Sequence, residues 1–92
     1  MTEANINKLL KKHPKLTHSE DRKVDSHVQR QKDDWYLNTL MLEGVLTPFK
    51  YKRRKKYRSL AGARVNLTYY PDTETVAGMD IEVMKVVRVK RS

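Results

Sequence analysis

The chain has 92 residues, no cysteine, and 20 lysine and arginine residues against 11 aspartate and glutamate residues, which gives a formal net charge of +9. This length fits one small domain, residues 1–92. The lack of cysteine excludes disulfides and thiolate metal sites. No run approaches the roughly 20 apolar residues of a membrane-spanning helix, and no signal-peptide pattern is visible. We therefore expect a cytoplasmic protein without a membrane span.

The positive charge is concentrated in one region. Residues 44–71 carry eight basic residues and no acidic residue, whereas the two flanking regions are close to balanced. At the centre of this region, residues 50–58 read KYKRRKKYR. A localised positive field of this kind favours a polyanionic partner, most often nucleic acid.

The first part of the chain contains a short candidate helix. Ile6, Leu9 and Leu10 follow helical spacing within residues 3–12. A helix of about ten residues is marginal without tertiary support. The sequence therefore predicts that residues 1–18 are flexible or loosely docked.

Residues 19–44 are predicted to form one long helix. Thr17 and Glu20 fit a capping box at its start. No glycine or proline interrupts the pattern before Gly44, a typical helix terminator. Residues 35–42 are mostly apolar or aromatic, so this half of the helix is expected in the core.

Two side chains in the other half of this helix suggest a contact. Val24 and Val28 lie four positions apart and share one helix face. That stripe could pack on the first helix or on a second copy of the chain. Trp35, at the start of the apolar half, is expected to anchor the core.

Residues 45–92 change to a period of two, which is typical of half-buried strands. Strands are expected at residues 49–54, 63–70 and 79–90, with a bulge where the alternation fails at residues 84–85. They predict an antiparallel meander of three or four strands, packed on the C-terminal half of the long helix. The expected fold class is α+β.

The strand alternation divides the basic run between two environments. Phe49 and Tyr51 are expected to face the core, and the intervening lysines an open edge of the sheet. The expected register sets Thr68 opposite Asp80, which leaves the first strand as the unopposed basic edge and Arg64 as its inner limit. The candidate nucleic-acid-binding residues are Lys50, Lys52, Arg53, Arg54, Lys55, Lys56, Tyr57, Arg58 and Arg64.

Tyrosines indicate the type of nucleic acid. Tyr57 in the loop and Tyr70 on the open face are available for base stacking, which is the usual device for single strands. We therefore expect RNA or another single strand, rather than duplex DNA, as the partner.

Catalytic and cofactor sites are not expected. His18, Asp21 and Asp25 have helical ligand spacing, but they lie on a polar face without a pocket. No serine has a histidine and an acid in a recognisable arrangement, and the three glycines form no phosphate loop. No motif points to a known family.

Three alternatives to nucleic-acid binding remain. Lysines on an edge strand can simply prevent edge-to-edge aggregation. The chain could be a protein-interaction or homodimerisation module that uses Val24 and Val28. It could also bind anionic lipid, although no amphipathic apolar face accompanies the basic run.

Overall fold

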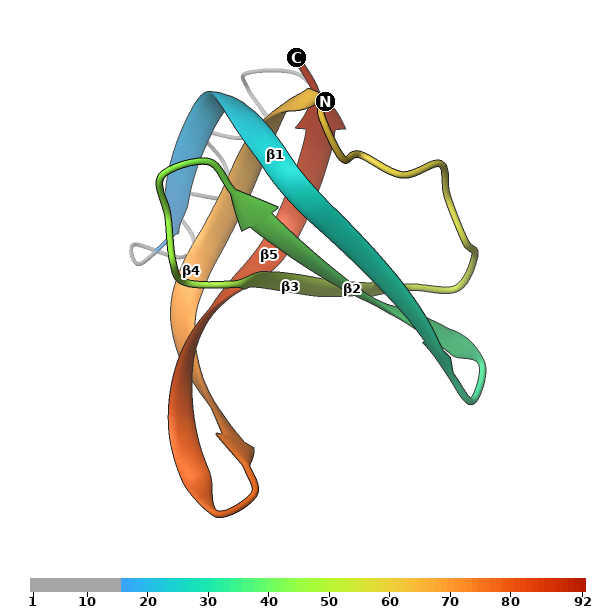
Figure 1. Cartoon of the computed structure of the whole chain (residues 1–92), viewed down its shortest axis with the longest axis vertical. Helices are drawn as coiled ribbons and strands as arrows, with labels where there is room; N and C mark the ends of the chain where they lie inside the picture. Colours follow the sequence, from blue (N-terminus) through green and yellow to red (C-terminus); the bar gives the residue numbers. More distant parts are fainter. Residues whose placement is uncertain (1–15) are drawn as a thin grey trace.

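The computed structural model describes residues 16–92, and within them every regular element is a β-strand (Figure 1). The short helix expected at residues 3–12 lies outside the described residues. Five strands form one sheet that closes into a barrel. None of residues 16–92 forms a helix with the length and apolar character that a membrane crossing needs. The strands are β1 (Thr17–Lys32), β2 (Trp35–Leu42), β3 (Phe49–Arg53), β4 (Arg64–Val76) and β5 (Met79–Arg91).

The predicted long helix is wrong, because its residues form the β1–β2 hairpin. The two strands pair antiparallel from Lys32↔Trp35 to Val24↔Leu42. A two-residue turn joins them, and its first residue, Asp33, has a left-handed φ of 56°. Aspartate tolerates this conformation because its short side chain can bond to nearby backbone. The turn therefore needs no glycine, and the fold class is all-β rather than α+β.

A β-bulge explains the misleading spacing of Val24 and Val28. Val24 pairs with Leu42 and Ser26 pairs with Met41, so Asp25 is left as an extra residue in β1. A bulge shifts the alternation by one position. Val24 is fully buried, whereas Val28 is 53% exposed. Of the two valines, only Val28 is therefore exposed on the surface of the described residues.

The second strand is apolar on both faces, which is why it looked helical. Leu40 and Leu42 point into the barrel and are buried, whereas Leu37 on the outer face is 37% exposed. Trp35 alternates with the inward residues and shares the outer face with Leu37. The prediction that Trp35 anchors the core is therefore wrong.

The strand order also differs from the predicted meander. β3 pairs antiparallel with β2 along its whole length and parallel with β5 at Phe49↔Met84 and Lys50↔Lys85. β4 returns to pair with β1, which is the 4-1-2-3 order of a Greek key. β5 then closes the barrel between β4 and β3. The basic strand β3 is consequently not a neighbour of β4.

The β4–β5 hairpin is longer than expected. Its turn lies at Ala77 and Gly78, both with positive φ. Thr68 therefore pairs with Arg88 rather than with Asp80, which pairs with Thr75 nearer the turn. The bulge predicted at residues 84–85 is found at Val87, which is skipped between two successive pairs.

The core fills the barrel interior. Phe49 is buried and packs edge-on against Tyr69, with ring centroids 4.8 Å apart. Tyr51 is partly buried against the same cluster, so the prediction that these two β3 side chains face inward is confirmed. The buried cluster comprises Val24, Leu40, Leu42, Phe49, Val65 and Leu67.

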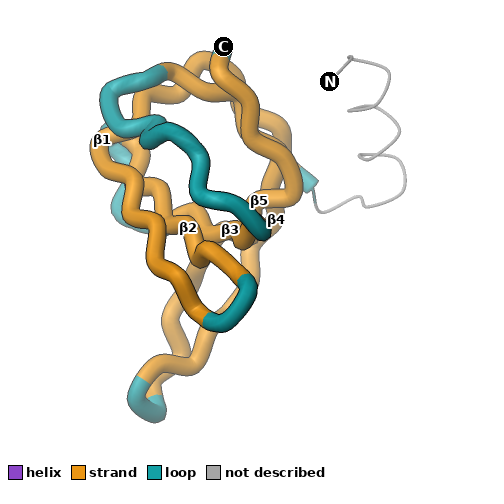
Figure 2. The backbone as a smooth tube through the Cα atoms, turned by 90° about the vertical axis from the view of Figure 1, so that its right-hand side faces the viewer, coloured by secondary structure: helices purple, strands orange, loops and turns teal. Residues whose placement is uncertain are grey.

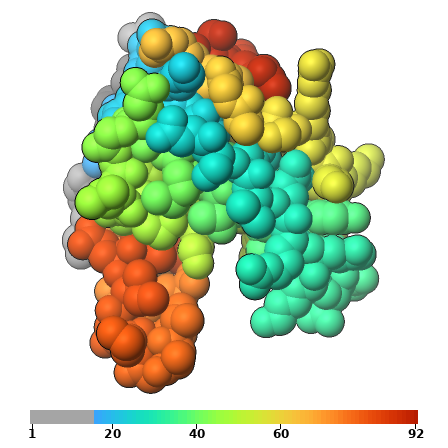
Figure 3. Space-filling model, in the orientation of Figure 1, coloured from blue at the N-terminus to red at the C-terminus, as the bar shows by residue number. Residues whose placement is uncertain are grey.

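The turn ends of the β1–β2 hairpin and the β4–β5 hairpin project from the barrel, and we call them the β1–β2 arm and the β4–β5 arm. In Figure 1 the β4–β5 arm and the β1–β2 arm point to the same side and diverge, and in Figure 3 a hollow separates them. Figure 2 shows how the loops connect these strands around the barrel. The two arms thus enclose a concave surface on the outside of the barrel.

Candidate functional site

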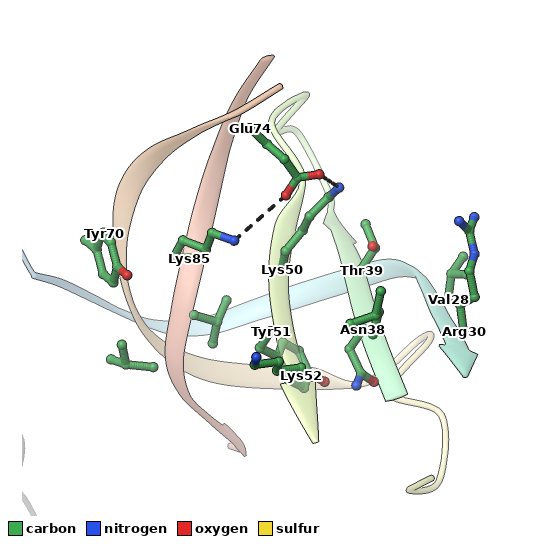
Figure 4. A pocket seen from close by; sticks show the side chains of 13 residues that line it. Val28, Arg30, Asn38, Thr39, Lys50, Tyr51, Lys52, Tyr70, Glu74 and Lys85 are labelled. Atoms are coloured by element: carbon green, nitrogen blue, oxygen red, sulfur yellow. Dashed lines mark hydrogen bonds and ion pairs between the residues drawn. The ribbon is translucent and has the colours of Figure 1, made fainter. Parts of the chain in front are cut away.

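A groove of about 520 Å³ lies between the two arms and draws side chains from all five strands (Figure 4). Its floor is the outer face of β1, β2 and β3, and its far wall is the β4–β5 arm. Cross-strand pairing sets two rows of the floor. One row is Val28, Thr39 and Lys50, and the next is Arg30, Leu37 and Lys52.

Part of this floor is apolar and open to solvent. Val28 is 53% exposed, Leu37 is 37% exposed and Val87 is 49% exposed. Tyr70 adds an aromatic ring on the β4 side. Exposed apolar side chains gathered in one concavity are typical of a ligand-binding surface.

Positive charge surrounds the apolar floor. Four of the residues that line the groove are cations and one is an acid. Arg30 and Lys52 make no ion pair with any other described residue. The groove therefore carries a net positive field. The cations are Arg30, Lys50, Lys52 and Lys85, and the acid is Glu74.

Glu74 connects the β4–β5 arm to β3. Its carboxylate accepts a hydrogen bond from Lys50 Nζ at 2.7 Å, and its second oxygen lies 3.8 Å from Lys85 Nζ (Figure 4). The hydrogen bond from Lys50, followed by the charges of both lysines, holds the pKa of Glu74 below its ordinary value. Glu74 thus occupies, as an anion, the position between two groove lysines.

Trp35 lies beside the groove, two positions before Leu37 on the outer face of β2. Two cations contact its ring: Lys52 Nζ lies 4.7 Å and the Arg54 guanidinium 4.5 Å from the centroid. Cations are attracted to the negative face of an indole. Trp35 therefore holds two side chains of the basic run on the groove side of the sheet.

The loop between β3 and β4 is tied to β1 by side chains. The Gln29 amide forms two hydrogen bonds with the backbone of Tyr57, and the Leu60 N–H donates to His27 Nδ1 at 2.8 Å. Because a backbone N–H is the donor, His27 Nδ1 accepts, and its Nε2–H donates to Asn38 Oδ1 at 2.7 Å. The loop is fixed at two points along its length.

Five of the predicted binding residues follow the chain from the groove into this loop. Lys50 and Lys52 line the groove. Arg54 lies over the Trp35 ring. Lys55 and Lys56 are solvent-exposed residues of the loop.

The other four predicted residues lie elsewhere. Arg53, Tyr57 and Arg58 line a second cavity of about 240 Å³ beneath the β3–β4 loop. Arg64 stands at the start of β4, where it donates to the Asp21 carbonyl at 3.0 Å and lies 3.5 Å from the Asp21 carboxylate. It lines neither cavity, so the structure does not place it with the other candidates.

Several groove residues were missed by the sequence analysis. Arg30 and Lys85 complete the ring of cations, and Val28 and Leu37 form its apolar floor. These residues come from strands that are distant in sequence. The β1–β2, β2–β3 and β3–β5 pairings bring them together, and none of these pairings was predicted.

Comparison with protein-family models, with curated proteins and with solved structures found no match. The function must therefore be inferred from the geometry of the groove. That geometry offers four cations, an open apolar floor and one acid paired with two of the lysines, and it suits an elongated ligand with both anionic and apolar parts.

Proposed function

We propose that this chain is a single-stranded nucleic-acid-binding module, with RNA as the favoured ligand, and that it has no catalytic activity. One observation carries the proposal: a single groove combines exposed apolar and aromatic side chains with four cations. Phosphates of a strand would meet the cations, and its bases would lie on the apolar floor.

The exposed floor favours a single strand over a duplex. In a duplex the bases are paired and stacked, and a surface that follows the backbone meets mainly phosphate and sugar. Val28, Leu37 and Tyr70 would then have nothing apolar to contact. In a single strand every base has an accessible face that can lie on such side chains.

The topology supports the same assignment by analogy. Five-stranded Greek-key barrels of the OB type bind oligonucleotides on the face of their second and third strands, between the loops that join strands one to two and four to five. The groove here lies on the outer face of β2 and β3, between the β1–β2 and β4–β5 arms. This likeness is one of topology alone.

The alternative of an edge-protecting basic strand has less support. β3 pairs with β2 along its whole length and with β5 at Phe49 and Lys50. Only its second half has an open side, whereas edge protection applies to exposed edges. The alternative of a homodimer contact through Val24 and Val28 has less support, since Val24 is buried.

A charge-matched pair of variants tests the proposal. The groove variant replaces Arg30, Lys52 and Lys85 by glutamine. The control variant replaces Arg22, Lys23 and Arg64, near the other end of β1, and removes the same number of charges. Fluorescence anisotropy with a labelled single-stranded RNA would give affinity as a function of salt.

Four phosphate contacts on a single strand correspond to a slope of roughly −3 for log K against log salt. We expect the groove variant to reduce this slope by about 2 and the control variant to leave it near the wild-type value. Equal reductions in both variants would mean that binding follows net charge alone, and the proposal would be wrong.

A further inference from the structure

The second cavity, beneath the β3–β4 loop, has an unusual charge balance. We call it the loop pocket, and it lies between that loop, β3 and the C-terminal end of β5. Among the described residues that line it, four are cations and none is an acid. The lining residues are His27, Asn38, Tyr51, Arg53, Tyr57, Arg58, Leu60, Val89, Lys90 and Arg91.

Two of these cations are held in place without an acidic partner. The Arg53 guanidinium lies between two tyrosine rings, 5.4 Å from the centroid of Tyr51 and 5.1 Å from that of Tyr57. Arg91 Nη2 donates to the Ser59 carbonyl at 3.1 Å. A guanidinium has five N–H donors, so neither a contact with tyrosine rings nor a single hydrogen bond uses all of them. Both arginines are thus positioned while retaining donors for a ligand.

Like charges gathered in one concavity repel each other, and the repulsion is relieved when an anion enters. Within residues 16–92, no carboxylate lines the pocket to relieve this repulsion. The side chains of Leu60 and Val89 form an apolar part of the wall, which strengthens the field by limiting the access of water. The pocket is therefore suited to a compact anion with several acceptor oxygens, such as a phosphate group.

Shared lining residues link the loop pocket to the groove. β3 and β5 pair at only two positions and then separate, which leaves a third cavity of about 180 Å³ between them. This cavity shares Tyr51 and Lys52 with the groove, and Tyr51 and Arg53 with the loop pocket. It adds a further cation, Arg88. We call these three adjoining cavities the basic track, and among the described residues that line it Glu74 is the only acid.

We propose that the loop pocket binds a phosphate group of the strand that occupies the groove, with its four lining cations, Arg53, Arg58, Lys90 and Arg91, as donors. This proposal rests on the proposed function of the groove. It adds a second anchoring point, at the opposite end of the track from Glu74. The phosphate is either internal to the strand or at its end, and a strand with or without a terminal phosphate distinguishes the two sources.

The first experiment needs no nucleic acid. Inorganic pyrophosphate is titrated into the isotope-labelled protein, and backbone amide shifts are followed by NMR. We expect saturable shifts at Tyr57, Leu60 and Val89, and their disappearance when Arg58 and Lys90 are both replaced by glutamine. Both residues are exposed, so this variant should fold. Absence of these shifts in the wild type would overturn the proposal that the loop pocket binds phosphate, whether or not the groove binds nucleic acid.

The second experiment uses an oligonucleotide of about 12 nucleotides, within the site size of one small barrel. The Arg58→Gln/Lys90→Gln variant should reduce the salt slope by about 0.7 for each phosphate that it no longer binds. The control is Lys55→Gln/Lys56→Gln, on the same loop but outside the pocket, and it should change the slope less. Equal slopes in the two variants would overturn the assignment.

The same oligonucleotide with and without a terminal phosphate separates the two sources. A preference for the phosphorylated strand that disappears in the Arg58→Gln/Lys90→Gln variant identifies a chain end, and a slope change without that preference identifies an internal phosphate. If pyrophosphate binds but no oligonucleotide does, the groove function fails and so does the assignment to a strand.

Discussion

The side-chain amide of Gln29 pairs with the backbone of Tyr57 as a neighbouring strand would. Gln29 Nε2 donates to the Tyr57 carbonyl at 2.7 Å, and the Tyr57 N–H donates to Gln29 Oε1 at 3.1 Å. This closed pair holds the middle of the β3–β4 loop against β1. The basic residues on either side of Tyr57 therefore have a fixed position relative to the barrel.

We predict that Gln29→Ala releases this loop. A typical intramolecular hydrogen bond contributes about 0.5–1.5 kcal/mol, and both bonds here are exposed, so the expected decrease in stability is about 1 kcal/mol. Hydrogen exchange at the Tyr57 amide should become much faster. Gln31→Ala, two positions along the same strand, is the control and should leave that exchange rate unchanged. If the Tyr57 amide were equally protected from hydrogen exchange in both variants, other contacts would hold the loop.

Replacing Glu74 should strengthen the binding of polyanions. Glu74→Gln removes the anion that pairs with Lys50 and Lys85, leaving both lysines for phosphate. The Lys50–Glu74 pair is partly buried but still reached by solvent. If such a pair contributes about 1 kcal/mol, the expected gain in affinity is up to about fivefold. Glu82→Gln, on the same arm, removes an equal charge outside the groove. A gain of the same size in both variants would assign the effect to net charge.

The same residue predicts a pH dependence of stability. The pKa of Glu74 is lowered in the folded state, mainly by the hydrogen bond from Lys50. Its contribution to stability is therefore complete above the ordinary pKa of a glutamate, and it disappears as the pH falls through the lower, folded-state value. Thermal unfolding of the wild type and Glu74→Gln should differ at neutral pH and converge in acid. A difference in thermal stability between the two proteins that stays constant into acid, below the folded-state pKa of Glu74, would contradict the prediction.

Trp35 should report on ligand binding, because it is the only tryptophan in the chain. Lys52 and Arg54 lie over its ring in the free protein. A phosphate chain that engages these cations should alter their contact with the indole and change its fluorescence. We expect this change to saturate at the same ligand concentration as the anisotropy signal. Arg54→Gln should reduce the amplitude, and Lys55→Gln should not.

The two valines of β1 should behave in opposite ways. Val24→Ala removes fully buried methyl groups and should cost about 2 kcal/mol of unfolding free energy. Val28→Ala should change stability by less than about 0.5 kcal/mol but weaken nucleic-acid binding, since Val28 lines the groove. Urea denaturation and anisotropy measure the two effects. Comparable destabilisation by both would contradict the bulge at Asp25.

The same valines show why part of the fold was predicted wrongly. Their spacing of four residues favours a helix, and β1 has no clear alternation because its bulge interrupts the period of two. β2 is apolar on both faces, which also hides the alternation. The turn at Asp33 uses no glycine or proline. In each case a tertiary feature, the closing of a barrel, overrides the local pattern.

The sequence predicted only those residues of the candidate site that lie close together in the chain, on β3 and the loop after it. The alternation of Lys50 and Lys52 with Phe49 and Tyr51 is strong, and the structure confirms which pair points outward. Arg30 and Lys85 reach the same groove through pairings that no sequence pattern specifies. Arg64 was included because the predicted strand order placed β4 beside β3.

The closure of the barrel has a consequence for folding. His18 and Thr68 are fifty residues apart in sequence, yet their strands must pair before the sheet closes. Such non-local contacts raise the contact order and slow folding. The two residue pairs between β3 and β5 also form only when the sheet closes. The groove and the loop pocket both depend on this closure. No fragment that lacks β5 can contain either cavity. A ligand that contacts both β3 and β5 would therefore bind only the closed barrel and stabilise the folded chain.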